Sequence, residues 1–345
     1  MILSYISKST KSKAIDMTKL KISIITPSYN HGRYLEETIK SILEQYYERL
    51  EYIIIDGGST DESVKIIKKY EQYLTYWTSE RDNGQSSAIN KGLRKATGDI
   101  ITWINSDDIL LPNSLNKVSE IFSKNPSIDF IFGRAILFGK KIKPVLKIAE
   151  TNDLHLRALA GMPYSQPACF FKKNIVSIYG YLDERLHLGM DYDLFVRIAL
   201  NANMLRVEDV FSKYRLHHES KSITQSLSFA NEWAIVFSKV LRSFSFTKNL
   251  IDEMKQLGLY CDGNDKYTTN KLFTKCDIEK AFLYFLEFQV HLHYHNLSLI
   301  KSKEFTSYIK EYNYDFYKTA SLNAIKLKST FLNKYLIDIL RIFTR

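Results

Sequence analysis

The segment "ITWINSDDILLP", residues 101–112, joins an apolar run directly to two acidic side chains. The run 100–104 is almost wholly apolar, which is typical of a strand buried on both faces inside a parallel sheet. Asp is rarely buried without a partner, so we expect Asp107 and Asp108 to emerge where this strand ends. Adjacent carboxylates there offer oxygen ligands to Mg²⁺ or Mn²⁺, although Asp is also common where a strand turns into a loop.

Similar runs recur along the first half of the chain. Strand-like segments at 21–26, 51–55, 75–79, 100–104 and 128–138 alternate with helical patterns. This alternation predicts an α/β fold with a mostly parallel sheet and helices on both faces. Ligands of such sheets bind outside the carboxyl ends of the strands. Three polar clusters follow predicted strands, "TPSYN", "DGGSTD" and "NSDD", so we expect them to form one site.

The pattern changes after about residue 225, where long helical stretches replace the strand and helix units. We therefore predict a basic tail at 1–20, an α/β domain at 21–225 and a helical region at 226–345. The last segment, "FLNKYLIDILRIFTR", has an apolar face and a basic face. Such a helix can lie in a membrane interface or pack on the domain, and both remain open.

The net charge of +10 is concentrated at the two ends of the 345-residue chain. Residues 1–21 carry five Lys and one Asp, and residues 318–345 carry six Lys or Arg and one Asp. A nucleic-acid-binding protein more often spreads basic side chains over one face, so we expect no nucleic-acid partner. Basic ends favour an anionic membrane surface, or simply solubility.

The amino terminus shows no apolar stretch typical of a signal peptide, and the three Cys have no metal-ligand spacing. We therefore expect a cytoplasmic protein, either free or on the inner face of the cytoplasmic membrane. Further along, "GMDYDLFVRIAL" (189–200) places Asp191 at the start of a predicted helix. A carboxylate there caps the helix, or acts as a general base if a hydroxyl is within reach.

The order of these segments resembles family-2 glycosyltransferases with the GT-A fold, a Rossmann-like arrangement. The resemblance extends from residue 21 to about 221 and is carried by three stretches. They begin "ISIITPSYNHGRYLEE" (22–37), "SERDNGQSSAIN" (79–90) and "YGYLDERLHLGMDYD" (179–193). The most similar branch is the bacterial one that builds O-antigen and other surface polysaccharides.

The resemblance implies roles for particular residues on the donor side. Asp56 matches the carboxylate that reads the uracil ring, and Pro27 and Tyr29 match the walls of the base pocket. Asp107 matches the metal-bound acid, with Ser106 beside it.

The resemblance also implies a second metal-side group and a catalytic base. Asp108 flanks the metal-bound acid, and His217, or else His218, matches the His that reaches the metal or diphosphate. Asp191 matches the general base. Met190 stands where many relatives have Glu, which leaves Asp193 as an alternative base.

The function implied is an inverting, Mn²⁺- or Mg²⁺-dependent sugar transfer. The expected donor is a nucleotide sugar, most simply UDP-linked, and the expected acceptor is a hydroxyl of a glycan or of a lipid-diphosphate-linked glycan. Asn105 replaces an Asp that many members carry, so one acidic contact is missing. Two alternatives remain: a non-catalytic nucleotide-sugar-binding module, and a sugar nucleotidyltransferase.

Overall fold

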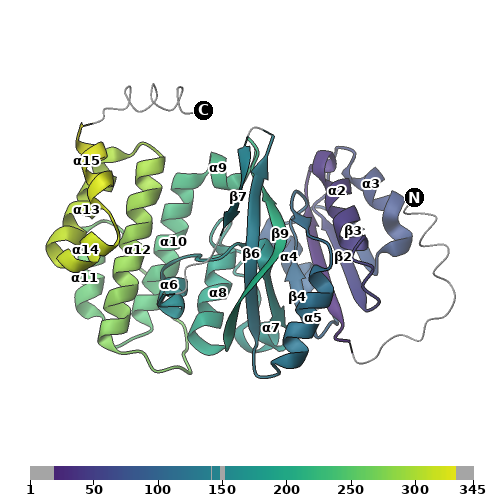
Figure 1. Cartoon of the computed structure of the whole chain (residues 1–345), viewed down its shortest axis with the longest axis horizontal. Coiled ribbons are helices and arrows are strands. Elements are labelled where there is room, and N and C mark those ends of the chain that lie inside the picture. Colours follow the sequence, from purple (N-terminus) through teal and green to yellow (C-terminus); the bar gives the residue numbers. More distant parts are fainter. Residues whose placement is uncertain (1–18, 141, 148–151, 332–345) are drawn as a thin grey trace.

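A computed structural model describes residues 19–140, 142–147 and 152–331 (Figure 1). Its strands form a single mixed sheet in the order β3-β2-β1-β4-β8-β6-β9-β5, with β7 paired to β6. The strands are β1 (Ile22–Ser28), β2 (Leu50–Asp56), β3 (Tyr76–Ser79), β4 (Ile100–Trp103), β5 (Ile109–Leu110), β6 (Phe130–Gly139), β7 (Ile142–Lys147), β8 (Cys169–Lys172) and β9 (Met204–Arg215). The five strands expected from apolar runs are all present.

Strands β3, β2, β1 and β4 run parallel, which confirms the predicted α/β architecture. The register places Ser28 of β1 opposite Asp56 of β2, so both strands end at the same edge. Beyond β4 the sheet continues with the antiparallel strand β8, and β6 then pairs parallel with β9. The polar clusters that follow β1, β2 and β4 therefore meet at one edge.

Helices cover both faces of the sheet. Because side chains alternate along a strand, Ile24 of β1 packs with α2 (Gly32–Leu43), α3 (Ser63–Tyr70) and α5 (Ser114–Lys124). Ile25 points to the opposite face, in one apolar cluster with α4 (Gln85–Lys95), α6 (Leu154–Ala160), α7 (Asn174–Tyr179) and α8 (Met190–Asn201). This is the predicted arrangement.

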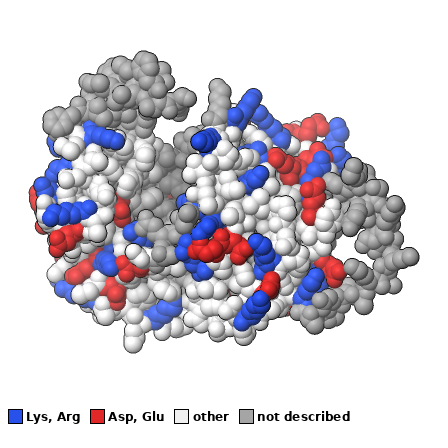
Figure 2. All heavy atoms as spheres, viewed as in Figure 1, with Lys and Arg blue, Asp and Glu red and all other residues white. Residues whose placement is uncertain are grey.

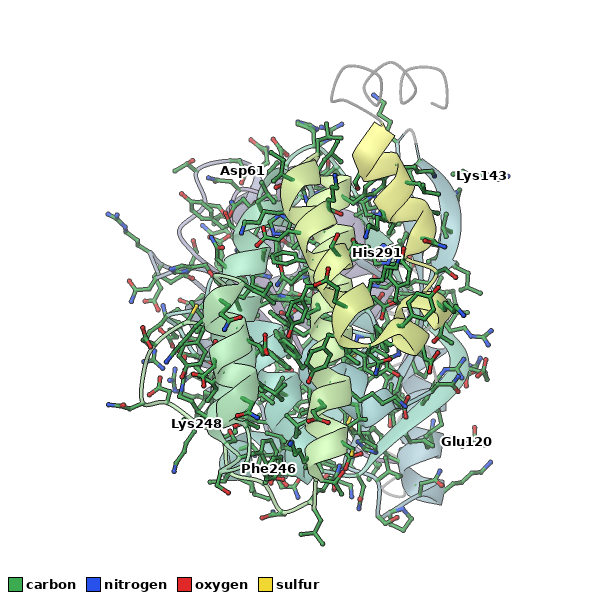
Figure 3. The ribbon with its side chains drawn as sticks, turned by 90° about the vertical axis from the view of Figure 1, so that its left-hand side faces the viewer. Asp61, Glu120, Lys143, Phe246, Lys248 and His291 are labelled. Atoms are coloured by element: carbon green, nitrogen blue, oxygen red, sulfur yellow. The ribbon has the colours of Figure 1, made fainter. Side chains whose placement is uncertain are left out.

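The region after residue 225 is helical, as expected, and α9 (Lys221–Thr224) leads into it. Its helices are α10 (Ser226–Arg242), α11 (Lys248–Gln256), α12 (Lys275–His295), α13 (Leu299–Tyr312), α14 (Tyr314–Thr319) and α15 (Asn323–Phe331). Figure 3 looks onto this helical end, with His291 on α12. A capping box of Thr274 and Asp277 starts α12.

The helical region shares its core with the α4 and α8 face of the sheet. Phe237 of α10 stacks on Phe285 of α12 with ring centroids 4.3 Å apart, and both belong to the same cluster as Ile25. The predicted amphipathic segment, 331–345, lies outside the described residues except for Phe331, which ends α15. Among the helices that are described, none combines the length and the apolar character needed to cross a membrane.

The face shown in Figure 2 carries basic and acidic side chains next to one another. Among such pairs, Glu208 of β9 is bonded to Arg134 of β6 and to Arg206. Such mixed pairs on a surface contribute little to stability, about 0–1 kcal/mol each. The cavity described next, and not this face, gathers the predicted site residues.

Candidate active site

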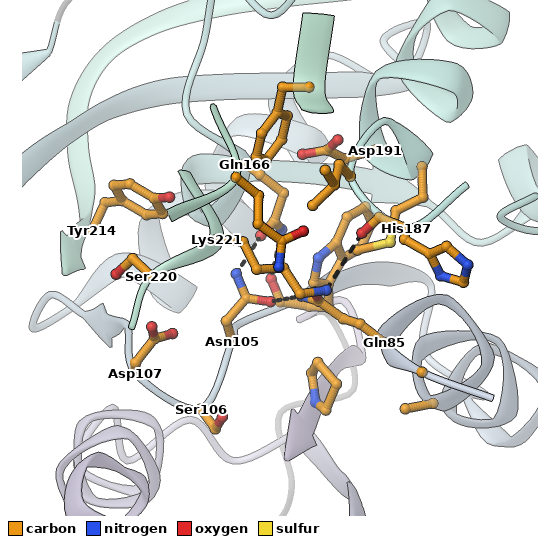
Figure 4. Close-up of a pocket in the computed structure, with 18 of the residues that line it drawn as sticks. Gln85, Asn105, Ser106, Asp107, Gln166, His187, Asp191, Tyr214, Ser220 and Lys221 are labelled. Atoms are coloured by element: carbon orange, nitrogen blue, oxygen red, sulfur yellow. Dashed lines mark hydrogen bonds between the residues drawn. The ribbon is translucent and has the colours of Figure 1, made fainter. Parts of the chain in front are cut away.

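A cavity of about 930 Å³ opens beyond the carboxyl ends of β1, β2 and β4 and reaches α10 and α12 (Figure 4). Five of the predicted site residues line it: Pro27, Tyr29, Ser106, Asp107 and Asp191. They come from segments more than 160 residues apart in the sequence. The other three predicted residues, Asp56, Asp108 and His217, are not among its lining residues, but His217 contacts Asp107, which is.

Asp56 is fully buried at the end of β2, and its carboxylate is occupied by protein donors. The Ser59 hydroxyl donates to Oδ1 at 2.6 Å, and the Ser79 hydroxyl and the Ser59 amide donate to Oδ2 at 2.7 and 2.8 Å. Both oxygens are therefore used to hold the loop that follows β2. Gly57 of that loop lines the cavity, and a Cβ there would lie 3.1 Å from the Asp82 carboxylate.

Asp108 is also fully buried. Its Oδ1 accepts a hydrogen bond from the Arg215 amide at 3.0 Å, and its Oδ2 accepts one from Asn105 Nδ2 at 3.2 Å. Burial, together with the neighbouring charge of Asp107, raises the pKa of Asp108 well above its usual value. The side chain fixes the turn between β4 and β5 and does not reach the cavity, so we assign it no metal contact.

Asp107 differs from its neighbour because it faces the cavity. His217 Nε2 lies 2.9 Å from Asp107 Oδ2, and Arg215 Nε donates to the Asp107 carbonyl at 2.8 Å. The His217 ring is held by Tyr34, with ring centroids 4.7 Å apart. Ser106 bonds to His31 Nδ1 at 2.7 Å on the same side. Acid and imidazole are thus brought together from the turn between β4 and β5 and from the segment after β9.

Asp191 lies in the first turn of α8 with its carboxylate in the cavity (Figure 4). Burial raises its pKa to about 6, and the nearby charge of Glu232 acts in the same direction. The Tyr192 amide and the charge of Lys221 oppose this shift. A carboxyl with a pKa near 6 is ionised at neutral pH and is a stronger base than a solvated Asp.

Asp193, the alternative base, has a different environment. Its carboxylate is buried and accepts hydrogen bonds from Lys239 Nζ at 3.0 Å, Tyr267 hydroxyl at 2.6 Å and Arg197 at 2.9 Å. These partners tie α8 to α10 and to the segment before α12. The cavity lining contains Asp191 and not Asp193.

Glu232 of α10 holds the turn that carries Asp191. Its carboxylate accepts from the amides of His187, Leu188 and Gly189 at 3.1, 2.8 and 2.7 Å. These amides precede α8, where helix N–H groups lack internal partners. Sequence reasoning missed Glu232 because no local pattern links it to a turn more than 40 residues earlier.

A chain of amide side chains forms part of the cavity floor (Figure 4). Gln85 Nε2 donates to Asn105 Oδ1 at 2.9 Å, and Lys221 Nζ donates to Gln85 Oε1 at 3.0 Å. Gln166 Nε2 donates to the Trp103 carbonyl at 2.8 Å. Asn105, noted as a departure from the acidic pattern, is therefore engaged by a neutral neighbour. Gln85 is the first residue of α4, and the sequence analysis gave it no functional role.

The model of "Glycosyl transferase family 2" matches residues 23–176. An uncharacterized glycosyltransferase of Rickettsia conorii is 31% identical over 227 residues, covering 61% of this chain and 37% of the relative. One from Mycobacterium tuberculosis is 30% identical over 200 residues, covering 56% of this chain and 74% of the relative. The chain belongs to glycosyltransferase family 2. It spans little more than a third of the Rickettsia conorii relative.

Solved structures give a consistent fold. Residues 1–349 of TarS from S. aureus, in complex with UDP, superpose with a TM-score of 0.51 at 17% identity, covering 90% of this chain and 91% of that one. The same part of TarS in complex with UDP-GlcNAc gives a TM-score of 0.52 with the same coverage. At this identity the likeness establishes the GT-A fold.

Proposed function

We propose that the chain is an inverting, metal-dependent glycosyltransferase. It moves a sugar from a UDP-linked donor to a hydroxyl of a glycan, or of a lipid-linked glycan, in bacterial surface-polysaccharide synthesis. The observation that carries this proposal is the shared cavity of Asp107 and Asp191, the latter with a pKa of about 6. The neighbours solved with UDP and UDP-GlcNAc support a UDP-linked donor.

The donor nucleotide occupies the sheet side of the cavity. Pro27 and Tyr29 flank the base there, and the backbone of Gly57 lies beside it. Asp56 contributes indirectly, because its hydrogen bonds to Ser59 and Ser79 fix the loop that presents Gly57. The amide of Gln85 and the ammonium of Lys221 stand on the same floor as Asn105, within reach of donor oxygens.

The groups around Asp107 fit a hard divalent cation that takes its other ligands from the substrate. Mg²⁺ is typically held by one or two carboxylates plus substrate phosphates, and Mn²⁺ accepts similar oxygen ligands. In the described part of the chain, no group of three or more His, Cys, Asp or Glu side chains forms an all-protein metal site. Asp107 and His217 would hold Mn²⁺ or Mg²⁺, which neutralises charge on the departing diphosphate when bound.

Asp191 acts on the other side of the cavity. Its carboxylate takes the proton of the acceptor hydroxyl as that oxygen bonds to the anomeric carbon and the bond to the diphosphate oxygen breaks. One displacement of this kind inverts the anomeric configuration. Glu232 keeps the turn before α8 in place, so the base is held by a side chain of the helical region.

The membrane part of the proposal rests on charge. Residues 318–345 carry six Lys or Arg and one Asp, and this positive excess would attract the chain to anionic lipid, where a lipid-linked acceptor is found. Removing 318–345 should lower binding to vesicles that contain anionic phospholipid and leave binding to neutral vesicles unchanged. Equal binding before and after the truncation would contradict it.

The test of the catalytic proposal is a thermal-shift screen against UDP, GDP, dTDP and CDP, with and without Mn²⁺, followed by turnover of UDP-sugars. A ligand present at 100 times its dissociation constant stabilises the folded state by about 2.7 kcal/mol. We expect a Mn²⁺-dependent shift with UDP that is lost in Asp107→Asn. Normal metal-dependent turnover by Asp107→Asn would refute the assignment. Binding of UDP without any turnover would favour the binding module.

A further inference from the structure

The hairpin of β6 and β7 exposes apolar side chains to solvent. It stands at the upper edge of the molecule in Figure 1, and β7 joins the sheet through β6. β7 is exposed along its whole length, although three of its six side chains are aliphatic. We call five exposed residues at this end the hairpin tip: Lys140, Ile142, Lys143, Val145 and Leu146.

The exposed aliphatic side chains of the hairpin tip lie close together in the sequence. Val145 is 54% exposed, Leu146 41% and Ile142 36%. Single exposed apolar side chains are ordinary on a protein surface, but contiguous ones mark a place where another molecule binds. Three of them between positions 142 and 146 therefore indicate a contact surface.

The hairpin tip is basic as well as apolar. Residues 135–147 contain no Asp or Glu, and neither Lys140 nor Lys143 forms an ion pair with a described residue. Lys213 of β9 lies on the same hairpin, over the Phe138 ring at 5.9 Å. A Lys beside an anionic lipid surface strengthens binding about fivefold, so this charge favours a partner that is both anionic and apolar.

A second strand is a poor partner for β7. Exposed edge strands invite pairing with another chain, and Pro and Lys are residues that discourage it. Pro144 has no N–H to donate, and the register with β6 shifts beside it, so that one extra residue bulges β7. Lys140 and Lys143 of two copies would also repel one another. The hairpin tip therefore fits a lipid surface better than a second copy of the chain.

The hairpin tip continues into the cavity. Residues opposite one another on paired strands point to the same face of a sheet. Val145 is opposite Leu137 of β6, and Leu137 is opposite Tyr214 of β9. Tyr214 lines the cavity, as does Lys147 at the end of β7. Because five residues of strand span about 16 Å, a surface that holds Ile142 lies close to the cavity.

The hairpin is fixed to the body of the domain. The Leu216 amide donates to the Phe138 carbonyl at 2.8 Å, and the Arg215 guanidinium lies 4.5 Å from the centroid of the Phe138 ring. Gly139 allows this close approach, because a Cβ there would clash with the Leu216 carbonyl. Contact between the hairpin tip and a surface would therefore orient the whole cavity.

We propose that the hairpin tip docks on an anionic membrane surface. Its aliphatic side chains enter the interface between headgroups and acyl chains, and its two Lys contact lipid phosphates. This surface is separate from residues 318–345, and it adds an apolar contact and a fixed orientation that charge alone does not give. Docking goes beyond the proposed function and does not depend on sugar transfer.

The test is co-sedimentation of the full chain with vesicles. Wild type should bind vesicles of phosphatidylglycerol and phosphatidylcholine about tenfold or more tightly than vesicles of phosphatidylcholine alone. Lys140→Gln together with Lys143→Gln should lower affinity for the anionic vesicles about 20-fold. Val145→Ser should lower it about three- to tenfold, because an apolar contact is lost.

The matched controls change the same groups elsewhere on the surface. Lys248→Gln together with Lys266→Gln removes the same charge, and Figure 3 shows Lys248 and Lys143 at opposite margins of the molecule. Ile178→Ser removes an aliphatic side chain that is 61% exposed on α7. Both controls should stay within about twofold of wild type, because charges beyond a Debye length are screened.

Insertion is measured directly with Val145→Trp and vesicles that contain brominated phospholipid. Bromine on the acyl chains should quench the added fluorescence of Val145→Trp, and Ile178→Trp should show only the quenching of the three native Trp. Binding to membranes through charge alone would leave the added Trp at position 145 unquenched.

Four outcomes would overturn the proposal. Wild type could fail to bind anionic vesicles; the hairpin variants could bind as tightly as wild type; Val145→Trp could remain unquenched; or light scattering could show a dimer that Val145→Ser dissociates, which would make a second copy the partner. Failure to bind UDP would instead refute the proposed function and leave these outcomes unchanged, so the two failures are distinguishable.

Discussion

The two walls of the cavity are built in opposite ways. On the sheet side, the polar groups are paired with one another: Asp107 with His217, and Asn105 with Gln85. On the helical side, aromatic side chains in the lining pack on one another: Trp233 of α10 stacks on Phe288 of α12, with ring centroids 4.0 Å apart. The sheet wall is therefore preorganised around a charged ligand, whereas the helical wall offers a packed aromatic surface.

Asp191 lies between the two walls, so a substitution there is the most direct test of whether catalysis can be separated from nucleotide binding. Asp191→Asn keeps the shape of the side chain but removes the base, so kcat should fall by about 10²–10⁴. Binding of UDP, which depends on the sheet wall, should be unchanged. Initial-rate measurements and the thermal shift with UDP check the two parts separately.

The pH dependence of the wild type belongs to the same prediction. Because Asp191 must be ionised to accept a proton and its pKa is about 6, kcat/KM should rise tenfold per unit below about pH 6 and level off above it. A kcat/KM that is flat between pH 5 and 7 would show that another group is the base.

Asp193 should show the reverse pattern, since it lies outside the cavity. Asp193→Asn removes the charge that Lys239 and Arg197 face in a buried setting, at 3.0 and 2.9 Å. Breaking one side of a buried ion pair costs about 3–5 kcal/mol, so the free energy of unfolding should fall by that amount. Urea unfolding measures it. If the variant instead folds normally and loses 10²-fold or more in kcat, Asp193 is the base and Asp191 is not.

Glu232 connects the two walls, because it belongs to α10 of the helical region and its carboxylate holds the turn before Asp191. Glu232→Gln puts an amide N–H₂ beside amides that need an acceptor, so stability should fall by about 1–3 kcal/mol. The negative charge that raises the pKa of Asp191 is also lost, so the acid limb of kcat/KM should move to lower pH. Glu120→Gln, on the exposed side of α5, is the control and should change neither. An unmoved acid limb would mean that Glu232 only supports the fold.

Much of the fold could be predicted from local pattern. The apolar runs that became β1, β2, β4 and the first half of β6 bury side chains on both faces, which makes them recognisable one at a time. The edge strand β3 was also predicted, although it is only partly buried. Strands β5, β7, β8 and β9 were not predicted. β7 is exposed and most of β9 is only half-buried, so neither forms a buried apolar run. β5 and β8 are two and four residues long and pair antiparallel with strands about 70 to 100 residues distant. Such short strands are defined by their neighbours, and not by their own periodicity.

The candidate site was predictable only in part, for a similar reason. Asp107 and Asp191 follow a strand and begin a helix, positions where a carboxylate stands out in the sequence. Glu232, Tyr164 and Trp233 do not occupy positions that the sequence pattern distinguishes in this way. Each gains its place from packing between α10, α12 and the end of α6, and no spacing along the chain predicts that contact.

The sequence by itself determined that carboxylates come at the end of β4 and at the start of α8, because strand and helix periodicity are local properties. Only the tertiary structure decided which of each pair faces the cavity. Asp107 does and Asp108 does not, because Arg215 and Asn105 hold the latter in the interior. Asp191 faces the cavity and Asp193 does not, because Lys239 and Tyr267 donate hydrogen bonds to the Asp193 carboxylate. Arg215, Lys239 and Tyr267 lie 46 to 107 residues from the carboxylates that they bind, so these partners meet only when the chain has folded.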